Sequence, residues 1–81
     1  MERVKEPIRI ATIFTPGRQL KPVWFEWHRR KHTILETTYF WKEKVGNTCL
    51  LHFSVTDGEA MYELIYDTAE QSWMLNGIEV K

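Results

Sequence analysis

The chain has 81 residues, with eleven acidic and eleven basic side chains, so its formal net charge at neutral pH is zero. A single cysteine, Cys49, excludes an internal disulfide, and no apolar run approaches the roughly 20 residues of a membrane span. These features predict one soluble, cytoplasmic domain that covers residues 1–81.

The first predicted strand covers Ile8 to Phe14, where every second residue is apolar or β-branched. Residues 1–6 precede it, carry alternating charges and are predicted to fray. The Pro16-Gly17 pair that follows the strand fits the central positions of a type II turn. The chain is therefore expected to reverse its direction there.

A second strand is predicted over residues 23–28, followed by a third over Thr33 to Lys44, which is rich in Thr, Tyr, Phe and Trp. In the second strand, alternation divides the side chains between two faces. One face carries Val23, Phe25 and Trp27, and the other carries Trp24, Glu26 and His28. The basic cluster between the two strands is thus predicted to lie at a hairpin tip.

The second half of the chain continues the pattern of short strands separated by turn residues. Predicted strands cover Thr48 to Val55, Tyr62 to Tyr66 and Trp73 to Val80, with turns at Gly46-Asn47 and Asp57-Gly58 and a bulge or kink at Asn76-Gly77. Residues 59–68 also fit a helix face capped by Asp57, although the strand interpretation is favoured. Together the segments predict an all-β fold, a small antiparallel meander of about five to six strands curled into a partly open barrel.

Charge is distributed unevenly along the chain. Residues 1–44 hold ten of the eleven lysines and arginines but only five acids, whereas residues 45–81 hold six acids and Lys81. Two interpretations remain open at this stage. The halves can lie side by side and pair their charges across strands, or each can form a binding face of one sign.

A family resemblance rests on aromatic and charged residues spread over residues 22–75. The series reads Pro22-x-x-Phe25-x-Trp27, Arg30, Leu35-Glu36, Trp41-x-Glu43, Tyr62-Glu63-Leu64-x-x-Asp67 and Trp73-x-Leu75. It resembles a small bacterial family of unknown function, whose members look like single β domains often encoded near error-prone translesion polymerase accessory proteins. The resemblance implies a β fold and a DNA-related or polymerase-related role. The family commonly has a glycine before the hairpin arginine, whereas here Arg29 precedes Arg30.

The candidate binding site consists of the basic cluster and the aromatic residues near it. Its residues are Trp24, Trp27, His28, Arg29, Arg30, Lys31, His32 and Trp41. Phosphates favour several cations at one tip, and exposed aromatic rings can stack on bases. The sequence therefore predicts a non-catalytic module that binds nucleic acid or a nucleic-acid enzyme. The alternative is a protein interaction or adaptor module, or a homodimer, in which a basic half meets an acidic half.

Metal binding and catalysis are not expected. His28-x3-His32 and Cys49-x2-His52 supply four possible zinc ligands, but Cys49 and His52 would point to opposite faces of one strand. Cys49 shares its face with apolar residues and is interpreted as a core thiol. The chain has no phosphate-binding glycine loop, nucleophile elbow or zincin motif. We expect no catalytic residue, no metal and no cofactor.

Overall fold

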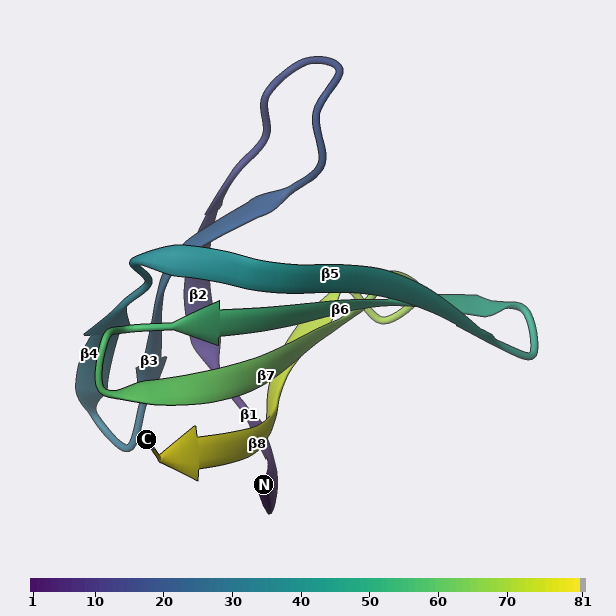
Figure 1. Ribbon diagram of the computed structural model, residues 1–81. Helices are drawn as coiled ribbons and strands as arrows, with labels where there is room; N and C mark the ends of the chain where they lie inside the picture. Colours follow the sequence, from purple (N-terminus) through teal and green to yellow (C-terminus); the bar gives the residue numbers. More distant parts are fainter. Residues whose placement is uncertain (81) are drawn as a thin grey trace.

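The computed structural model describes residues 1–80, which form eight strands and no helix (Figure 1). The strands are β1 (Glu2–Pro7), β2 (Arg9–Ile13), β3 (Lys21–Trp27), β4 (Arg30–Thr33), β5 (Glu36–Val45), β6 (Thr48–Thr56), β7 (Ala60–Asp67) and β8 (Ser72–Val80). They build a five-stranded sheet of order β1-β8-β7-β6-β5 and a three-stranded sheet of order β2-β3-β4, in which all neighbours are antiparallel. The described residues thus include no helix that could cross a membrane.

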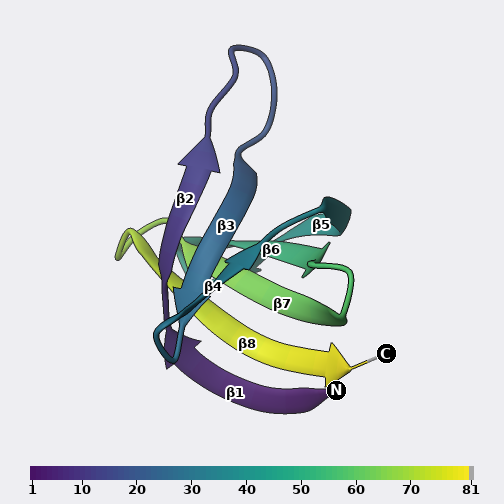
Figure 2. The same cartoon turned by 90° about the vertical axis from the view of Figure 1, so that its left-hand side faces the viewer.

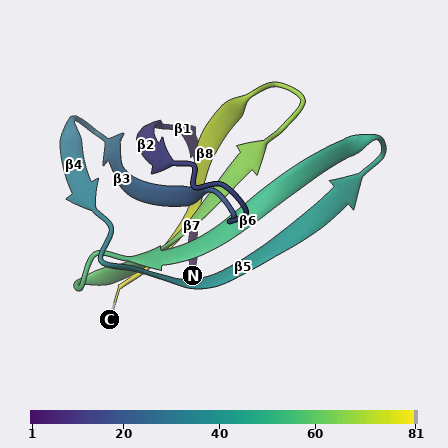
Figure 3. The ribbon, with the colours of Figure 1, turned by 90° about the horizontal axis from the view of Figure 1, so that it is seen from above.

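The predicted all-β antiparallel class is confirmed, but the structure has eight strands in two sheets where five to six strands in one curled meander were predicted. The two sheets do not close on each other, and the small sheet lies across one face of the large sheet (Figures 2 and 3). Residues 60–67 form strand β7, so the strand interpretation of this segment is confirmed over the helix.

The N-terminal segment is not frayed as predicted, because residues 2–7 form the edge strand β1 beside β8. A strand at a sheet edge gains backbone hydrogen bonds without needing an apolar face, so its alternating charges did not reveal it. Val4 adds an apolar contact to the core. A bulge between Arg3 and Glu6, with Lys5 at φ 55°, interrupts this edge. Such bulges discourage pairing with other chains.

The predicted strand Thr33 to Lys44 corresponds to β5, but Thr33 instead ends β4, because the chain crosses from the small sheet to the large one at Ile34 and Leu35. The Ile34 amide donates to the Val23 carbonyl at 2.9 Å, and the Leu35 amide donates to the Thr56 carbonyl at 2.8 Å. Successive residues therefore bond to different sheets. No glycine or proline marks this crossing, so the sequence carried no signal for it.

Two predicted local features are confirmed by backbone geometry. The Arg18 amide donates to the Thr15 carbonyl at 2.9 Å and Gly17 has φ 75°, as a type II turn requires. In β8 the register with β7 shifts at Asn76, which forms the predicted bulge. Turn chemistry therefore located these irregularities correctly.

The core lies between the two sheets and is built from the faces that alternation predicted. Phe25 of the small sheet and Phe53, Val55, Leu64 and Leu75 of the large sheet are fully buried, at 0% exposure. The Phe25 ring meets the Tyr62 ring edge-on, with 5.0 Å between their centroids. Such aromatic packing supplies much of the buried apolar area of a domain this small.

Candidate nucleic-acid interface

The β3–β4 hairpin ends in a two-residue turn made of His28 and Arg29. Trp27 pairs with Arg30 across the hairpin, and the two turn residues have φ 51° and 63°. Positive φ at both central residues defines a type I′ turn, which normally contains asparagine and glycine. A non-glycine residue in this conformation costs about 1 kcal/mol or more. Arg29 thus replaces the glycine that the family resemblance predicts, and its backbone is strained.

Strand alternation separates the residues of the predicted site. Phe25 is fully buried and pairs with His32, so both point toward the large sheet. Trp24 and Lys31 belong to the alternate positions and point to the opposite side of the small sheet. The structure therefore does not bring all eight predicted residues together.

The outer surface of the small sheet, viewed in Figure 2, will be called the small-sheet face. Register and burial place on it Arg9, Ile13, Lys21, Trp24, Glu26 and Lys31. Lys31 extends over Trp24, with its Nζ atom 4.8 Å from the ring centroid. This cation–π contact places a positive charge on the central aromatic ring of the face.

Most of the positive charge on this side of the molecule is not neutralised within the fold. Arg9, which lies 3.4 Å from Glu26, is the only lysine or arginine of residues 1–80 within 4.0 Å of a carboxylate. The interpretation that lysines and arginines of residues 1–44 pair with acids of the second half is therefore wrong over the described residues. Arg29, Arg30 and Lys31 remain unpaired at and beside the hairpin tip.

Trp27 and His28 are held by Glu6 of β1. The Trp27 indole Nε1–H donates to Glu6 Oε1 at 3.3 Å, and His28 Nε2 lies 3.1 Å from the same oxygen. The imidazole of His28 stacks on the Trp27 ring at a centroid distance of 4.1 Å. Both rings therefore fasten the hairpin to the edge of the large sheet, which leaves Trp24 as the aromatic residue of the small-sheet face.

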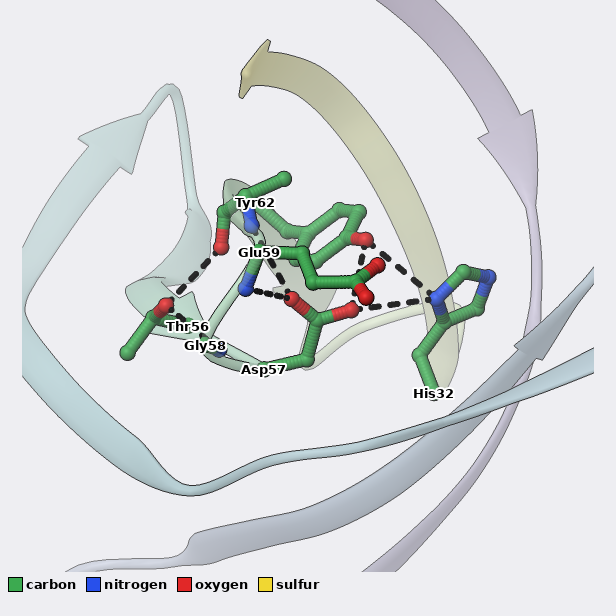
Figure 4. A network of polar contacts seen from close by, with 7 residues as sticks. His32, Thr56, Asp57, Gly58, Glu59 and Tyr62 are labelled. Atoms are coloured by element: carbon green, nitrogen blue, oxygen red, sulfur yellow. Dashed lines mark hydrogen bonds and ion pairs between the residues drawn. The ribbon is translucent and has the colours of Figure 1, made fainter. Parts of the chain in front are cut away.

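His32 joins a polar cluster between the sheets, together with Asp57 and Tyr62 (Figure 4). The Tyr62 hydroxyl donates to Asp57 Oδ2 at 2.8 Å, and His32 Nδ1 lies 3.4 Å from that oxygen and 3.2 Å from the hydroxyl. Because Tyr62 donates its only proton to Asp57, we infer that His32 Nδ1–H is the donor in its own contacts. The cluster connects β4 of the small sheet to the β6–β7 turn and β7 of the large one.

The proton affinities in this cluster suit a structural role. Burial raises the pKa of Asp57, but hydrogen bonds from the Glu59 and Ala60 amides, Tyr62 and His32 outweigh it and lower the pKa to about 2. Burial and the adjacent carboxylate raise the pKa of Tyr62 well above its ordinary value. At neutral pH the carboxylate is therefore ionised and the phenol protonated, so Asp57 serves as a fixed acceptor between the sheets.

Trp41 lies on the outer side of the large sheet, away from the hairpin. It stacks on His52 at a centroid distance of 4.6 Å, and His52 Nε2–H donates to Glu43 Oε1 at 2.9 Å. His52 is 7% exposed, and its Nδ1 atom has no hydrogen-bond partner, with Glu63 Oε1 4.0 Å away. Asn76 Nδ2 donates to the same Glu63 oxygen at 2.6 Å. Trp41 thus belongs to a second polar network on a different surface.

Sequence reasoning missed the partners that hold the predicted residues. Glu6, Asp57 and Tyr62 lie 21 to 30 positions away from the side chains that they contact, so no local motif could reveal them. Cys49 is half-buried, and no group of three or more His, Cys, Asp or Glu side chains in residues 1–80 is placed to hold a metal ion. Comparison of the chain with protein-family models, curated proteins and solved structures found no match.

Proposed function

We propose that this protein is a small, non-catalytic module that binds nucleic acid through the β3–β4 hairpin tip and the small-sheet face. The observation that carries the proposal is the presence of three unpaired cations at the hairpin end of the small sheet. Arg29 lies in the turn, Arg30 pairs with Trp27, and Lys31 extends over Trp24. Phosphate groups bind such clusters and release counterions as they do so.

A zero net charge is compatible with this proposal, because the charges are separated in space. Register places Glu43, Glu63, Asp67 and Glu79 on the outer side of the large sheet, opposite the small sheet. The small-sheet face and the hairpin tip therefore form a local positive region, and local potential governs the attraction of a charged ligand.

The proposal also covers the cellular compartment of the protein and the process in which it takes part. A single half-buried cysteine fits a reducing compartment, so we place the module in the cytoplasm. The resemblance to a small bacterial family encoded near translesion polymerase accessory proteins supports a DNA-related role, in which the ligand is nucleic acid or a complex of a polymerase with it.

The proposal is tested by reversing charge at the hairpin. Replacing Arg29, Arg30 and Lys31 with glutamate should weaken binding of a fluorescein-labelled oligonucleotide at least about 100-fold at low salt, because three phosphate contacts become repulsive. Fluorescence anisotropy at about 50 and 200 mM salt measures the affinity and its salt dependence. Circular dichroism checks that the exposed substitutions leave the fold intact.

A matched variant distinguishes the effect of the hairpin charges on binding from the effect of the net charge of the whole protein. Replacing Lys5, Lys42 and Lys44 with glutamate changes the net charge equally, but these exposed residues lie on β1 and β5. This control should retain most of the affinity. Equal losses in both variants, or an unchanged affinity in the hairpin variant, would contradict the proposal.

A second candidate function, self-association, is favoured by the opposite charges of the two outer surfaces. The acidic side of the large sheet also carries three large apolar side chains, Trp41, Ile65 and Met74, which register aligns across the strands together with His52. The small-sheet face of a second copy would complement it. Sedimentation velocity should then show dimers or larger species at about 50 mM salt that dissociate at about 500 mM. A monomer at both concentrations would exclude this candidate.

A further inference from the structure

Two large apolar side chains are exposed where β2 ends. Ile13 is 51% exposed and Phe14, the next residue, is 78% exposed. Single exposed apolar residues are common on protein surfaces and need no explanation. Here the two are adjacent, and they stand at the base of the loop of residues 14–20, which projects from the body of the domain (Figure 1).

The loop that follows Phe14 is held in a defined conformation. Thr15 to Arg18 form the hydrogen-bonded type II turn, in which Pro16 has a fixed φ and Gly17 adopts φ 75°. Leu20, at the other end of the loop, is buried in the core. Phe14 stands between the end of β2 and this turn, and these two ordered neighbours limit the conformational entropy that its backbone loses on binding.

The surroundings of the loop are suited to an anionic ligand. A groove of about 570 Å³ lies beside it, and its lining includes Arg18, Gln19, Lys21 and one acid, Glu36. Neither Arg18 nor Lys21 lies within 4.0 Å of a carboxylate among residues 1–80. Arg18, on the same loop as the Phe14 ring, and Lys21, at the start of β3, are thus two unpaired cations available to contact phosphate.

The loop and the hairpin tip lie at opposite ends of β3, with Trp24 between them on the small-sheet face. The seven residues of β3 extend over about 23 Å. A strand of nucleic acid that crossed this distance would meet cations at the tip, the Trp24 ring with Lys31, and then cations and Phe14 at the loop. Site sizes of four or more nucleotides are common on β folds that use such stacking.

We propose that the ligand is single-stranded nucleic acid and that Phe14 stacks on one of its bases. This inference rests on the proposed function and narrows it. Bases of an intact duplex are already stacked on each other, so they cannot cover the faces of Phe14 and Trp24. Unpaired bases can do so, and each stacked base contributes substantially to affinity whatever its identity.

The experiment compares Phe14 variants on a 12-nucleotide oligothymidine, the matching oligouridine and a 12-base-pair duplex, all labelled with fluorescein. Phe14→Ala should weaken single-strand binding about tenfold and leave duplex binding unchanged. Phe14→Tyr should retain the affinity, because the ring is kept. Phe14→Leu should bind as weakly as the alanine variant, because it is apolar but cannot stack. The two oligonucleotides show whether DNA or RNA is preferred.

The outcomes distinguish this inference from the function on which it rests. If the folded wild-type protein binds none of the three probes, the proposed function fails and the inference fails with it. If the wild-type protein binds and the hairpin charge-reversal variant does not, the function stands. If the function stands but Phe14→Ala or Phe14→Leu binds the single strands as tightly as the wild-type protein does, Phe14 does not stack on a base. An equal loss on duplex and single strand overturns the preference for unpaired bases.

Discussion

Replacing Phe25 with alanine is expected to lower the free energy of unfolding by about 3–5 kcal/mol. Phe25 has the largest fully buried side chain of the small sheet. Its ring stacks on His32 with 4.8 Å between centroids and meets Tyr62 edge-on at 5.0 Å. Domains of about this size have a total stability of roughly 4–12 kcal/mol, so the loss would leave little reserve.

Thermal and urea unfolding followed by circular dichroism measure this effect. A loss of 3 kcal/mol corresponds to a melting temperature lower by at least about 12 °C in a domain of this length. Val45→Ala is a suitable control, because Val45 is exposed at the end of the β5–β6 hairpin, and it should change stability by less than about 0.5 kcal/mol. A Phe25→Ala variant that unfolds like the control would contradict the packing of the two sheets through this ring.

The fold class was predictable because side-chain alternation in strands is a local property. It placed Phe25 on the opposite face of its strand from Trp24, and Phe25 is buried; glycine and proline marked the turn at Pro16-Gly17. The division into two sheets was not predicted, because the crossing at Ile34 and Leu35 depends on backbone hydrogen bonds to two different sheets. No local residue preference encodes those partners, so the sequence did not reveal β4 as a strand separate from β5.

The sequence predicted which charged residues lie near the hairpin, but it did not predict which of them share one surface. The basic cluster was predicted to form a hairpin tip, but only His28 and Arg29 form the turn, and the rest of the cluster lies in β4. Alternation sends Lys31 to the small-sheet face and His32 into the space between the sheets. Trp41 lies on the other sheet, and Trp27 is engaged by Glu6. Residues that are close in sequence were therefore wrongly grouped into one site, because adjacent residues of a strand point to opposite faces of the sheet. Phe14 was predicted as the last residue of a strand. Its exposure depends on where the loop leaves the sheet, which side-chain alternation does not show.

The second large expected effect is a loss of folding stability in acid, caused by protonation of Asp57. The pKa of Asp57 in the folded protein is about 2, compared with its ordinary value of 3.8. A carboxyl group with a lowered pKa contributes its stabilisation fully above pH 4 and loses it as the pH falls through 2. With the side chain 12% exposed, we expect this contribution to be about 2 kcal/mol. Urea unfolding of the wild-type protein should therefore show stability that falls between pH 4 and pH 2.

Asp57→Asn isolates this contribution from the other acids of the chain. Asparagine has a similar shape and can accept the Glu59 and Ala60 amide hydrogen bonds, but it carries no charge for Tyr62 and His32. The variant should be less stable than the wild-type protein at pH 7, and the difference should shrink toward zero near pH 2. Asp67→Asn is the matched control, because Asp67 accepts the same kind of turn amides, from Ala69 and Glu70.

The comparison of the two asparagine variants distinguishes two roles of Asp57: stabilising a turn, and connecting the two sheets. If Asp57 acts only as a turn residue, both variants should lose the same small amount of stability at every pH. If it also connects the sheets through Tyr62 and His32, Asp57→Asn alone should show the larger, pH-dependent loss. A difference from the wild-type protein that stays constant from pH 7 to pH 2 would show that the charge of Asp57 does not stabilise the contact between the sheets.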